Sequence, residues 1–124
     1  MGGEAAKYAR LVDVCKRGDF DVIYDMVSDD VEWWEVGASA PIRGKDNLIA
    51  TEREELAQWS ITPSVHDVLA SDDHVVSLVE ATAKRDDAVF NYRTVEIFHV
   101  DDEGKVTHRW SFADDTQAVK DFFA

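Results

Sequence analysis

Two glutamates stand beside aromatic residues in segments whose side chains alternate between faces, and such carboxylates can carry acid–base chemistry. Glu35 shares one face of the segment 30–36 with Trp33, since side chains two residues apart on a strand point the same way. Glu96 is the single carboxylate on its face of the segment 90–100, beside Phe90, Tyr92, Thr94 and Phe98. Burial among apolar groups raises the pKa of a carboxyl group toward neutral pH, where it can move protons.

Both glutamates also have simpler interpretations. Glu35 is equally well an exposed glutamate at the end of a strand. Glu96 could instead form an ion pair with Arg109 across the neighbouring strand, which would lower its pKa and prevent it from acting as a neutral donor. The residues alone leave these alternatives open.

Other site chemistries lack their residues. The four histidines, His66, His74, His99 and His108, have no close ligand spacing and no HExxH or CxxC motif is present, so we expect no metal. No nucleophile elbow and no glycine-rich phosphate loop occurs, and no cofactor is expected. The lone Cys15 falls on a helical pattern and is expected to be a buried small hydrophobe, which fits a cytoplasmic protein.

Composition sets the class of protein. A chain of 124 residues that is 45% hydrophobic predicts one domain, 1–124, with a core and one cavity. The net charge of −13 repels nucleic acid and anionic membranes, so neither is expected as a partner. No apolar run approaches the roughly 18 residues that span a bilayer, and no secretory signal is recognised.

Two periodicities divide the chain. A helical period predicts helices over 4–16, over a segment that starts at Asp19 and buries Phe20, Ile23, Tyr24 and Val27, and over 45–59. After Ser64 the period becomes two, which predicts strands at 65–71, 74–84, 90–100 and 105–113, and then a short final helix. Short Asp- and Gly-containing turns join these strands, so the class is α+β, with helices on one face of a curved sheet.

The sheet is apolar on both faces. In the segment 74–84, Glu80 and Leu78 lie on one face, whereas the opposite face carries Val75, Ser77, Val79 and Ala81. Such a sheet must be covered on both sides, by helices on one and by a second subunit on the other. We therefore expect a homodimer through an outer face made of Trp34, Val95, Ile97, Trp110 and Phe112.

The chain resembles the NTF2-like superfamily, in its SnoaL-like and ketosteroid-isomerase-like branch. The resemblance rests on Gly18-Asp19, on the run Val27-Ser28-Asp29-Asp30-Val31, on Pro41 with Arg43-Gly44, and on Gly104-Lys105-Val106. It implies a cone-shaped fold, with three N-terminal helices packed on a strongly curved, mostly antiparallel sheet that encloses a pocket. The fold hosts isomerases, cyclases, dehydratases, epoxide hydrolases and non-catalytic binders, so it implies no single activity.

The resemblance also implies roles for residues. Glu35 falls at the position of the isomerase's catalytic base, and Glu96 at that of its protonated oxyanion-hole acid, both of which are Asp in the family. The family's oxyanion-hole tyrosine would fall at Leu11, which cannot donate a hydrogen bond, and Tyr8 is the nearest phenol. The family register turns Arg109 toward the pocket, whereas a bulge in the last strand would place His108 there instead.

These inferences predict a pocket for a small apolar ligand. Its expected lining is Tyr8, Leu11, Trp33, Trp59, Leu78, Glu80, Tyr92, Thr94, Phe98 and Ser111. Glu35, Glu96 and Arg109 are the expected catalytic residues of a cofactor-independent isomerase, cyclase or dehydratase acting on a planar ketone or polyketide-like substrate. A non-catalytic binding or dimerisation domain is the alternative, and an epoxide hydrolase the third.

Overall fold

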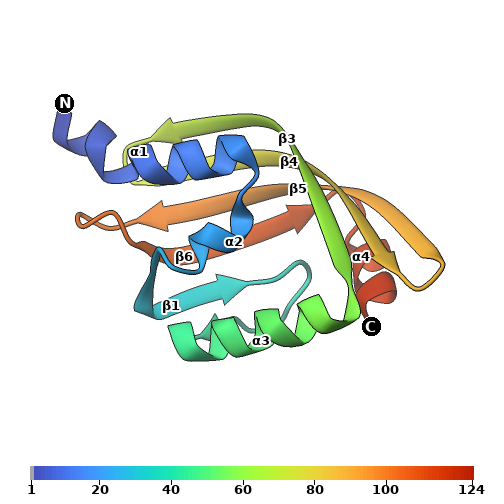
Figure 1. Cartoon of the computed structure of the whole chain (residues 1–124). Helices are drawn as coiled ribbons and strands as arrows, with labels where there is room; N and C mark the ends of the chain where they lie inside the picture. Colours follow the sequence, from blue (N-terminus) through green and yellow to red (C-terminus); the bar gives the residue numbers. More distant parts are fainter. Residues whose placement is uncertain (1) are drawn as a thin grey trace.

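A curved sheet with helices packed against it forms the computed structural model, which describes the backbone of residues 2–124 and the side chains of residues 7–124 (Figure 1). The helices are α1 (Gly2–Arg17), α2 (Phe20–Ile23), α3 (Lys45–Gln58) and α4 (Thr116–Phe123). The strands are β1 (Val27–Trp34), β2 (Ile42–Arg43), β3 (Ser60–Ser71), β4 (His74–Arg85), β5 (Ala88–Val100) and β6 (Val106–Ala113).

The six strands form one sheet in the order β2-β1-β6-β5-β4-β3. Only the β1–β6 pair within it is parallel. Strands β3 to β6 form a continuous antiparallel run, and its last strand, β6, lies beside β1. Helix α1 packs against β3 and β4, and α3 packs against β1 and β2. The predicted α+β class and mostly antiparallel sheet are confirmed. The helices number four in the described chain, the three N-terminal ones and the predicted C-terminal one.

The second helix is shorter than its apolar pattern predicts. It makes a single turn, and Val27, expected on its inner stripe, begins β1 instead. Val27 pairs with Val106 of the parallel strand β6, and the Val106 amide donates to the Met26 carbonyl at 2.9 Å. Sheet pairing of these buried valines outweighs the helical spacing, so β1 starts earlier than the predicted residue 30.

Strand β3 also starts earlier than predicted, at Ser60 rather than residue 65, and it runs through Pro63. Proline lacks the amide hydrogen that a central strand needs on both sides, but β3 is an edge strand and bonds only to β4. A bulge between Val65 and Asp67 then shifts the register. Pro63 therefore lies within an edge strand that begins directly after helix α3 has ended at Gln58.

The two faces of β4 are reversed relative to the prediction, which placed Leu78 and Glu80 in the pocket. Val75, Ser77, Val79, Ala81 and Ala83 are the buried side chains of β4 and point toward the helices. Leu78 and Glu80 lie on the outer face, where Leu78 pairs with Val95, and Glu80 forms an exposed ion pair with Arg93 at 3.6 Å. Because both faces of the strand carry apolar residues, alternation alone did not distinguish inside from outside.

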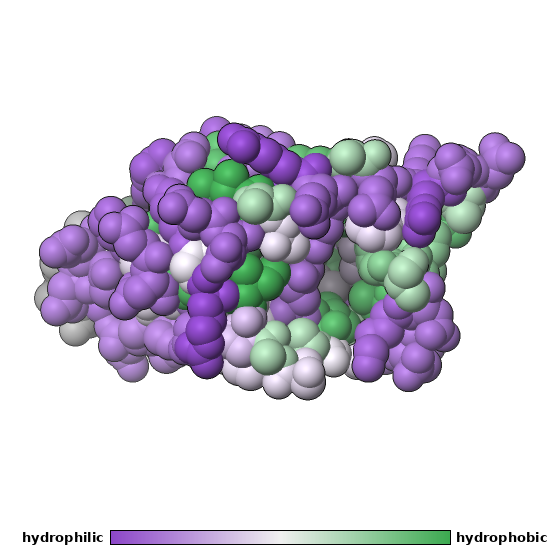
Figure 2. Space-filling view, turned by 90° about the horizontal axis from the view of Figure 1, so that it is seen from below, coloured by the Kyte–Doolittle hydropathy of each residue, from purple (hydrophilic) through white to green (hydrophobic). Residues whose placement is uncertain are grey.

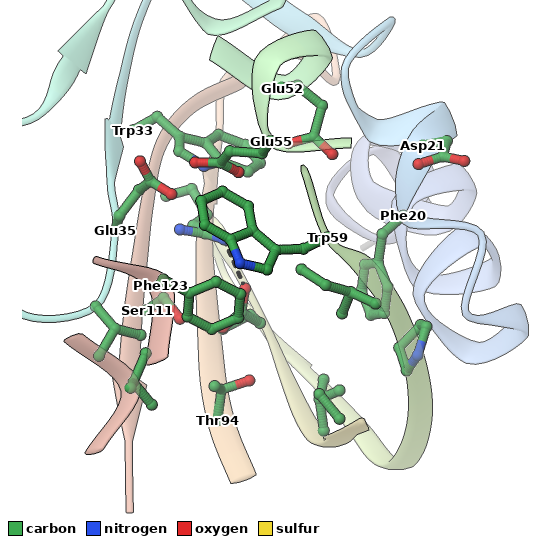
Figure 3. A pocket seen from close by; sticks show the side chains of 18 of the residues that line it. Phe20, Asp21, Trp33, Glu35, Glu52, Glu55, Trp59, Thr94, Ser111 and Phe123 are labelled. Atoms are coloured by element: carbon green, nitrogen blue, oxygen red, sulfur yellow. Dashed lines mark hydrogen bonds and ion pairs between the residues drawn. The ribbon is translucent and has the colours of Figure 1, made fainter. Parts of the chain in front are cut away.

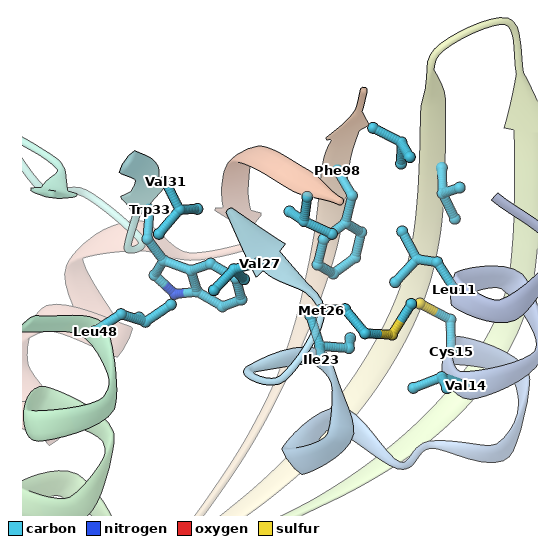
Figure 4. Packing of buried hydrophobic residues seen from close by; sticks show 13 residues of the cluster. Leu11, Val14, Cys15, Ile23, Met26, Val27, Val31, Trp33, Leu48 and Phe98 are labelled. Atoms are coloured by element: carbon cyan, nitrogen blue, oxygen red, sulfur yellow. The ribbon is translucent and has the colours of Figure 1, made fainter. Parts of the chain in front are cut away.

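The core fills the narrow end of the fold, between α1, α2 and the sheet (Figure 4). Leu11, Cys15, Ile23, Val27 and Phe98 are at most 1% exposed. Cys15 is thus the buried small residue that was predicted, and burial followed by the nearby charge of Glu96 raises the pKa of its thiol to about 12. This core closes one end of the molecule and leaves the space for a cavity at the other.

Candidate functional site

A cavity of about 820 Å³ lies between α2, α3, α4 and the inner face of the sheet. Figure 2 shows a largely hydrophilic face with hydrophobic residues gathered where the surface is hollowed. The close view in Figure 3 places the carboxylates of Glu35, Glu52 and Glu55 near Trp33, and Ser111 and Thr94 on the sheet side of the Trp59 indole. The cavity therefore combines aromatic and apolar walls with several charged side chains.

Glu96 is held by two donors from the neighbouring strand. Its Oε1 lies 2.9 Å from Nη2 of Arg109, and its Oε2 accepts a hydrogen bond from Ser111. The register explains these contacts, since Glu96 is opposite Ser111 and Phe98 is opposite Arg109 across the β5–β6 pair. The ion-pair alternative for Glu96 is thus the one that the structure shows, and with both oxygens accepting, Glu96 is not arranged as a neutral donor.

Arg109 faces the cavity side of the sheet, as the family register implied. Its Nη1 donates to the Trp34 carbonyl at 2.8 Å, and its guanidinium carbon lies 4.3 Å from the centre of the Trp33 ring. Its side chain is only 14% exposed. Carboxylate, carbonyl and aromatic face together fix the guanidinium in one position. His108, the alternative, lies on the opposite face, where its Nε2 contacts Glu32.

The carboxyl group of Glu55 lies beside that of Glu35. Glu55 of α3 shares a side-chain hydrogen bond with Glu35, which follows the end of β1. Burial first, then the hydrogen bond and charge of Glu35, and then the charge of Glu52 raise the pKa of Glu55 to about 8. Glu55 therefore keeps its proton at neutral pH, and it is joined to Glu35 by a hydrogen bond at the wall of the cavity.

Glu52 completes this end of the cavity. Tyr24 donates its hydroxyl to Oε2 of Glu52 at 2.7 Å. Burial raises the pKa of Glu52, whereas the hydrogen bond from Tyr24 lowers it. The Tyr24 ring also packs on Trp33 at 5.4 Å, so the phenol links the turn after α2 to α3 across the aromatic wall.

The structure brings most of the predicted site residues together. Lining residues of the cavity include Glu35, Glu96, Arg109, Trp33, Trp59, Tyr92, Thr94 and Ser111. Burial raises the pKa of the Tyr92 phenol to about 12, so it stays a hydrogen-bond donor.

Five predicted lining residues lie elsewhere. Leu11 and Phe98 belong to the buried core, and Tyr8 packs against that core beside them. Leu78 and Glu80 are on the outer face of the sheet. Large apolar side chains fill the narrow end of the cone, so the cavity occupies only its wide end.

Several lining residues were missed. Glu55, Phe123 and Val79 line the cavity together with Phe20, Asp21, Tyr24, Glu52, Leu56, Ala81 and Val119. A signal for Glu55 was present in the sequence, because Glu52 and Glu55 are three residues apart on the predicted helix 45–59 and therefore lie on the same side of it. Val79 was missed because the prediction placed the opposite face of β4 in the pocket. Phe123 was missed because the final helix was not predicted to line the pocket.

Within the part of the chain that the structure describes, no group of three or more His, Cys, Asp or Glu side chains is placed to hold a metal ion. None of the helices in residues 2–124 is long and apolar enough to cross a membrane.

A family model described as a SnoaL-like domain matches residues 8–109, a range that includes Glu35, Glu96 and Arg109. The chain belongs to the SnoaL-like family. The comparison with curated proteins gave no match.

Solved structures similar to this SnoaL-like chain show the same fold. A putative SnoaL-like polyketide cyclase from Jannaschia sp. CCS1 is 18% identical with a TM-score of 0.72, over 96% of this chain and 90% of that one. An NTF2-like protein of unknown function from Burkholderia pseudomallei is 14% identical with a TM-score of 0.75, over 100% and 99%. An LEH-like epoxide hydrolase from M. tuberculosis is 18% identical with a TM-score of 0.69, over 91% and 84%.

Proposed function

We propose that this SnoaL-like protein is a cofactor-independent enzyme that transfers protons on a small planar ketone or polyketide-like substrate, in an isomerisation, cyclisation or dehydration. The observation that carries the proposal is the Glu35–Glu55 pair, two carboxyl groups joined by a hydrogen bond at the wall of an aromatic cavity. Glu35 can accept a proton from the substrate, and Glu55, whose pKa is raised to about 8, can donate one.

The roles follow from the surroundings of each group. Glu35 is the base that removes a proton next to a carbonyl, and the protonated Glu55 returns a proton to the substrate. Arg109 supplies positive charge where the enolate forms, Glu96 holds the guanidinium in place, and Ser111 donates a hydrogen bond to Glu96. The expectation from the sequence was that Glu96, either neutral or paired with Arg109, stabilises the enolate.

The shape and lining of the cavity support a flat, mainly apolar substrate. Trp33, Trp59 and Tyr92 present ring surfaces, and Tyr92 packs edge-on to Phe123 at 5.8 Å. A volume of about 820 Å³ falls in the range of pockets for drug-sized ligands. Flat rings stack well on such walls, whereas a highly charged substrate would meet Glu35, Glu52 and Glu55.

A direct test measures exchange of the α-hydrogens of 2-tetralone and related bicyclic ketones in D₂O by NMR. We expect the wild type to accelerate exchange, and Glu35→Gln to slow it by about 100-fold or more. Glu55→Gln should alter the pH profile of the reaction. Glu54→Gln, on the exposed side of α3, is the matched control and should leave the rate unchanged.

Two outcomes would contradict the proposal. If the rate of α-hydrogen exchange were the same in Glu35→Gln, Glu55→Gln and the wild type, neither glutamate would take part in the proton transfer. Ketones that raise the melting temperature without any catalysed exchange would favour the alternative, a non-catalytic binding domain with the same cavity.

Epoxide hydrolysis is the second candidate, favoured by a separate observation. Arg109 lies 2.9 Å from Glu96, and its positive charge also acts to lower the pKa values of Glu52 and Glu55, so several carboxyl groups surround one cation in the cavity. An acid that protonates an epoxide oxygen and a carboxylate that activates water would suffice for hydrolysis. Formation of a diol from styrene oxide in ¹⁸O-labelled water, with no exchange of ketone hydrogens, would identify this reaction.

A further inference from the structure

Tyr24 contacts two walls of the cavity at once. Its ring packs on Trp33 of β1 at 5.4 Å, and its hydroxyl donates to Oε2 of Glu52 on α3 at 2.7 Å. Tyr24 directly follows the last residue of α2, so the turn before β1 holds the phenol between these two walls. Glu52 in turn lies three residues before Glu55, the proposed acid, on the same helix.

The hydrogen bond from Tyr24 favours the ionised form of Glu52. An ionised carboxylate only accepts hydrogen bonds, and a donor directed at it stabilises its charge. Burial first, and then the charge and the hydrogen bond of Glu52, raise the pKa of Tyr24, so the phenol keeps its hydrogen and remains the donor. Burial raises the pKa of Glu52, and Tyr24 opposes this effect. Without the hydroxyl of Tyr24, Glu52 would take up a proton more readily.

Glu55 lies between two other carboxyl groups. Figure 3 shows its side chain between those of Glu35 and Glu52. A hydrogen bond joins Glu55 to Glu35, and such a bond between two carboxyl groups requires that one of them carries a hydrogen. Glu52 and Glu55 lie on the same side of α3, because residues three apart are neighbours on a helix. A negative charge on Glu52 therefore favours the neutral form of Glu55.

We propose that Tyr24 and Glu52 are positioning residues that keep the reacting hydrogen on Glu55, an inference that rests on the proposed function. Tyr24 holds Glu52 as an ionised carboxylate, and the charge of Glu52 makes the loss of the proton from Glu55 unfavourable. Neither residue needs to touch the substrate for this role. If Glu52 were neutral, Glu55 would release its proton at a lower pH and would be a poorer acid at neutral pH.

The other charges near Glu55 act in both directions. Glu35, beyond the end of β1, favours its neutral form together with Glu52, whereas Arg109 of β6 favours its ionised form. Asp21 of α2 favours the neutral form of Glu52. Since Arg109 acts against Glu35 and Glu52, the ionisation of Glu52 decides the balance at Glu55. The remaining titratable side chains that line the cavity are Asp19, Tyr92, Glu96 and Lys120.

Carbon-13 NMR of the full chain, labelled at the side-chain carboxyl carbon of glutamate, measures the protonation of each group directly. The signals of Glu52 and Glu55 are identified by their loss in Glu52→Gln and Glu55→Gln. We expect the pKa of Glu55, about 8 in the wild type, to fall by about one unit in Glu52→Gln. Tyr24→Phe, which keeps the ring on Trp33, should raise the pKa of Glu52 and lower that of Glu55. Glu54→Gln, on the exposed side of α3, is the matched control and should leave both values unchanged.

The pH profile of α-hydrogen exchange from 2-tetralone gives a second readout. If Glu55 donates the proton, the rate falls as the pH rises through its pKa. This fall should move to lower pH in Glu52→Gln and in Tyr24→Phe, and it should stay in place in Glu54→Gln. A purely structural role of Tyr24 and Glu52 would lower the rate at every pH without moving the profile.

The outcomes separate this inference from the proposed function. A pKa of Glu55 that is unchanged in Glu52→Gln would overturn the role of Glu52, and one that is unchanged in Tyr24→Phe would overturn that of Tyr24. A shifted pKa with an unshifted rate profile would overturn the link to the reaction. Shifted pKa values without catalysed exchange, even in the wild type, would support the control of the proton on Glu55 and reject the proposed reaction.

Discussion

Arg109 is the residue that connects the two walls of the cavity. It contacts Glu96, the Trp34 carbonyl and the Trp33 ring, and both charged partners are nearly buried, with 14% and 13% of their side chains exposed. Removing one member of such a pair leaves the other charge buried without compensation. The guanidinium thus stabilises the fold as well as the proposed enolate.

We predict that Arg109→Met lowers the free energy of unfolding by about 3 kcal/mol. Arg93→Met is the control, because Arg93 and Glu80 are 74% and 61% exposed and 3.6 Å apart, and such surface pairs contribute less than about 1 kcal/mol. Urea unfolding at neutral pH measures both. Equal losses in the two variants would mean that Arg109 owes its position to packing and not to charge.

The Glu35–Glu55 pair gives stability a pH dependence of known sign. The ordinary pKa of a glutamate, 4.5, is raised to about 8 at Glu55, so the folded chain binds more protons than the unfolded chain between these values. The contribution of this group to stability therefore falls as the pH rises through this window, and the loss is complete above about pH 8.

We expect Glu55→Gln to be more stable than the wild type at about pH 9 by about 1 kcal/mol, a value reduced for partial solvent screening, and close to the wild type at about pH 5. Thermal unfolding at the two values of pH measures the difference. Glu54→Gln should show no such gain, and a Glu55→Gln curve parallel to the wild type would contradict the raised pKa of Glu55.

Single residues were predicted from the sequence where one face of a strand was clearly distinct. Glu96 and Tyr92 alternate with polar or outward residues, and both line the cavity. Glu55 was not found, because its helix was interpreted through its apolar stripe alone. A pattern of apolar residues marks what is buried but not which carboxyl groups meet across a cavity.

At the scale of elements, the hairpin turns were the most predictable part of the chain. The two-residue turns Asp72-Asp73 and Asp86-Asp87 lie where they were expected, and Asp72 and Asp86 adopt positive φ angles of 50° and 55°. Aspartate tolerates this left-handed region better than most residues, and two-residue hairpins require it. Local chemistry determines these turns, so no knowledge of the tertiary structure was needed.

Asp86→Val should therefore lower the free energy of unfolding by about 1–2 kcal/mol, since a β-branched side chain is strained at positive φ. Asp87→Val, one position further along the same exposed turn, has no positive φ and should change stability by less than about 0.5 kcal/mol. Thermal unfolding of both variants measures the contrast, and an equal effect would show that charge, and not backbone conformation, matters there.

The less predictable elements are those that depend on distant partners. The one-turn length of α2 and the early start of β1 follow from the pairing of Val27 with Val106, which is 79 positions away in the chain. Strand β2 has only two residues, and its pairing with β1 defines it. No local pattern contains this information.

At the scale of the whole molecule, the net charge of −13 opposes compaction and association alike. We expect an increase in salt from about 0.02 M to about 0.5 M to raise the melting temperature, because the Debye length falls from tens of ångströms to a few. A potassium chloride series followed by calorimetry would measure this. A melting temperature that falls with salt would mean that ion pairs such as Arg109–Glu96 outweigh the general repulsion.

Helix α4 supplies Val119, Lys120 and Phe123 to the cavity, so the chain ends beside the proposed ligand site, whereas α1 begins at the opposite end of the molecule (Figure 1). A purification tag fused after Ala124 would start within one residue of Phe123, a side chain that lines the cavity. Ligand screening therefore calls for a tag on the other terminus. The same proximity is useful for detection, because a fluorophore attached at the C-terminus would report on occupancy of the cavity.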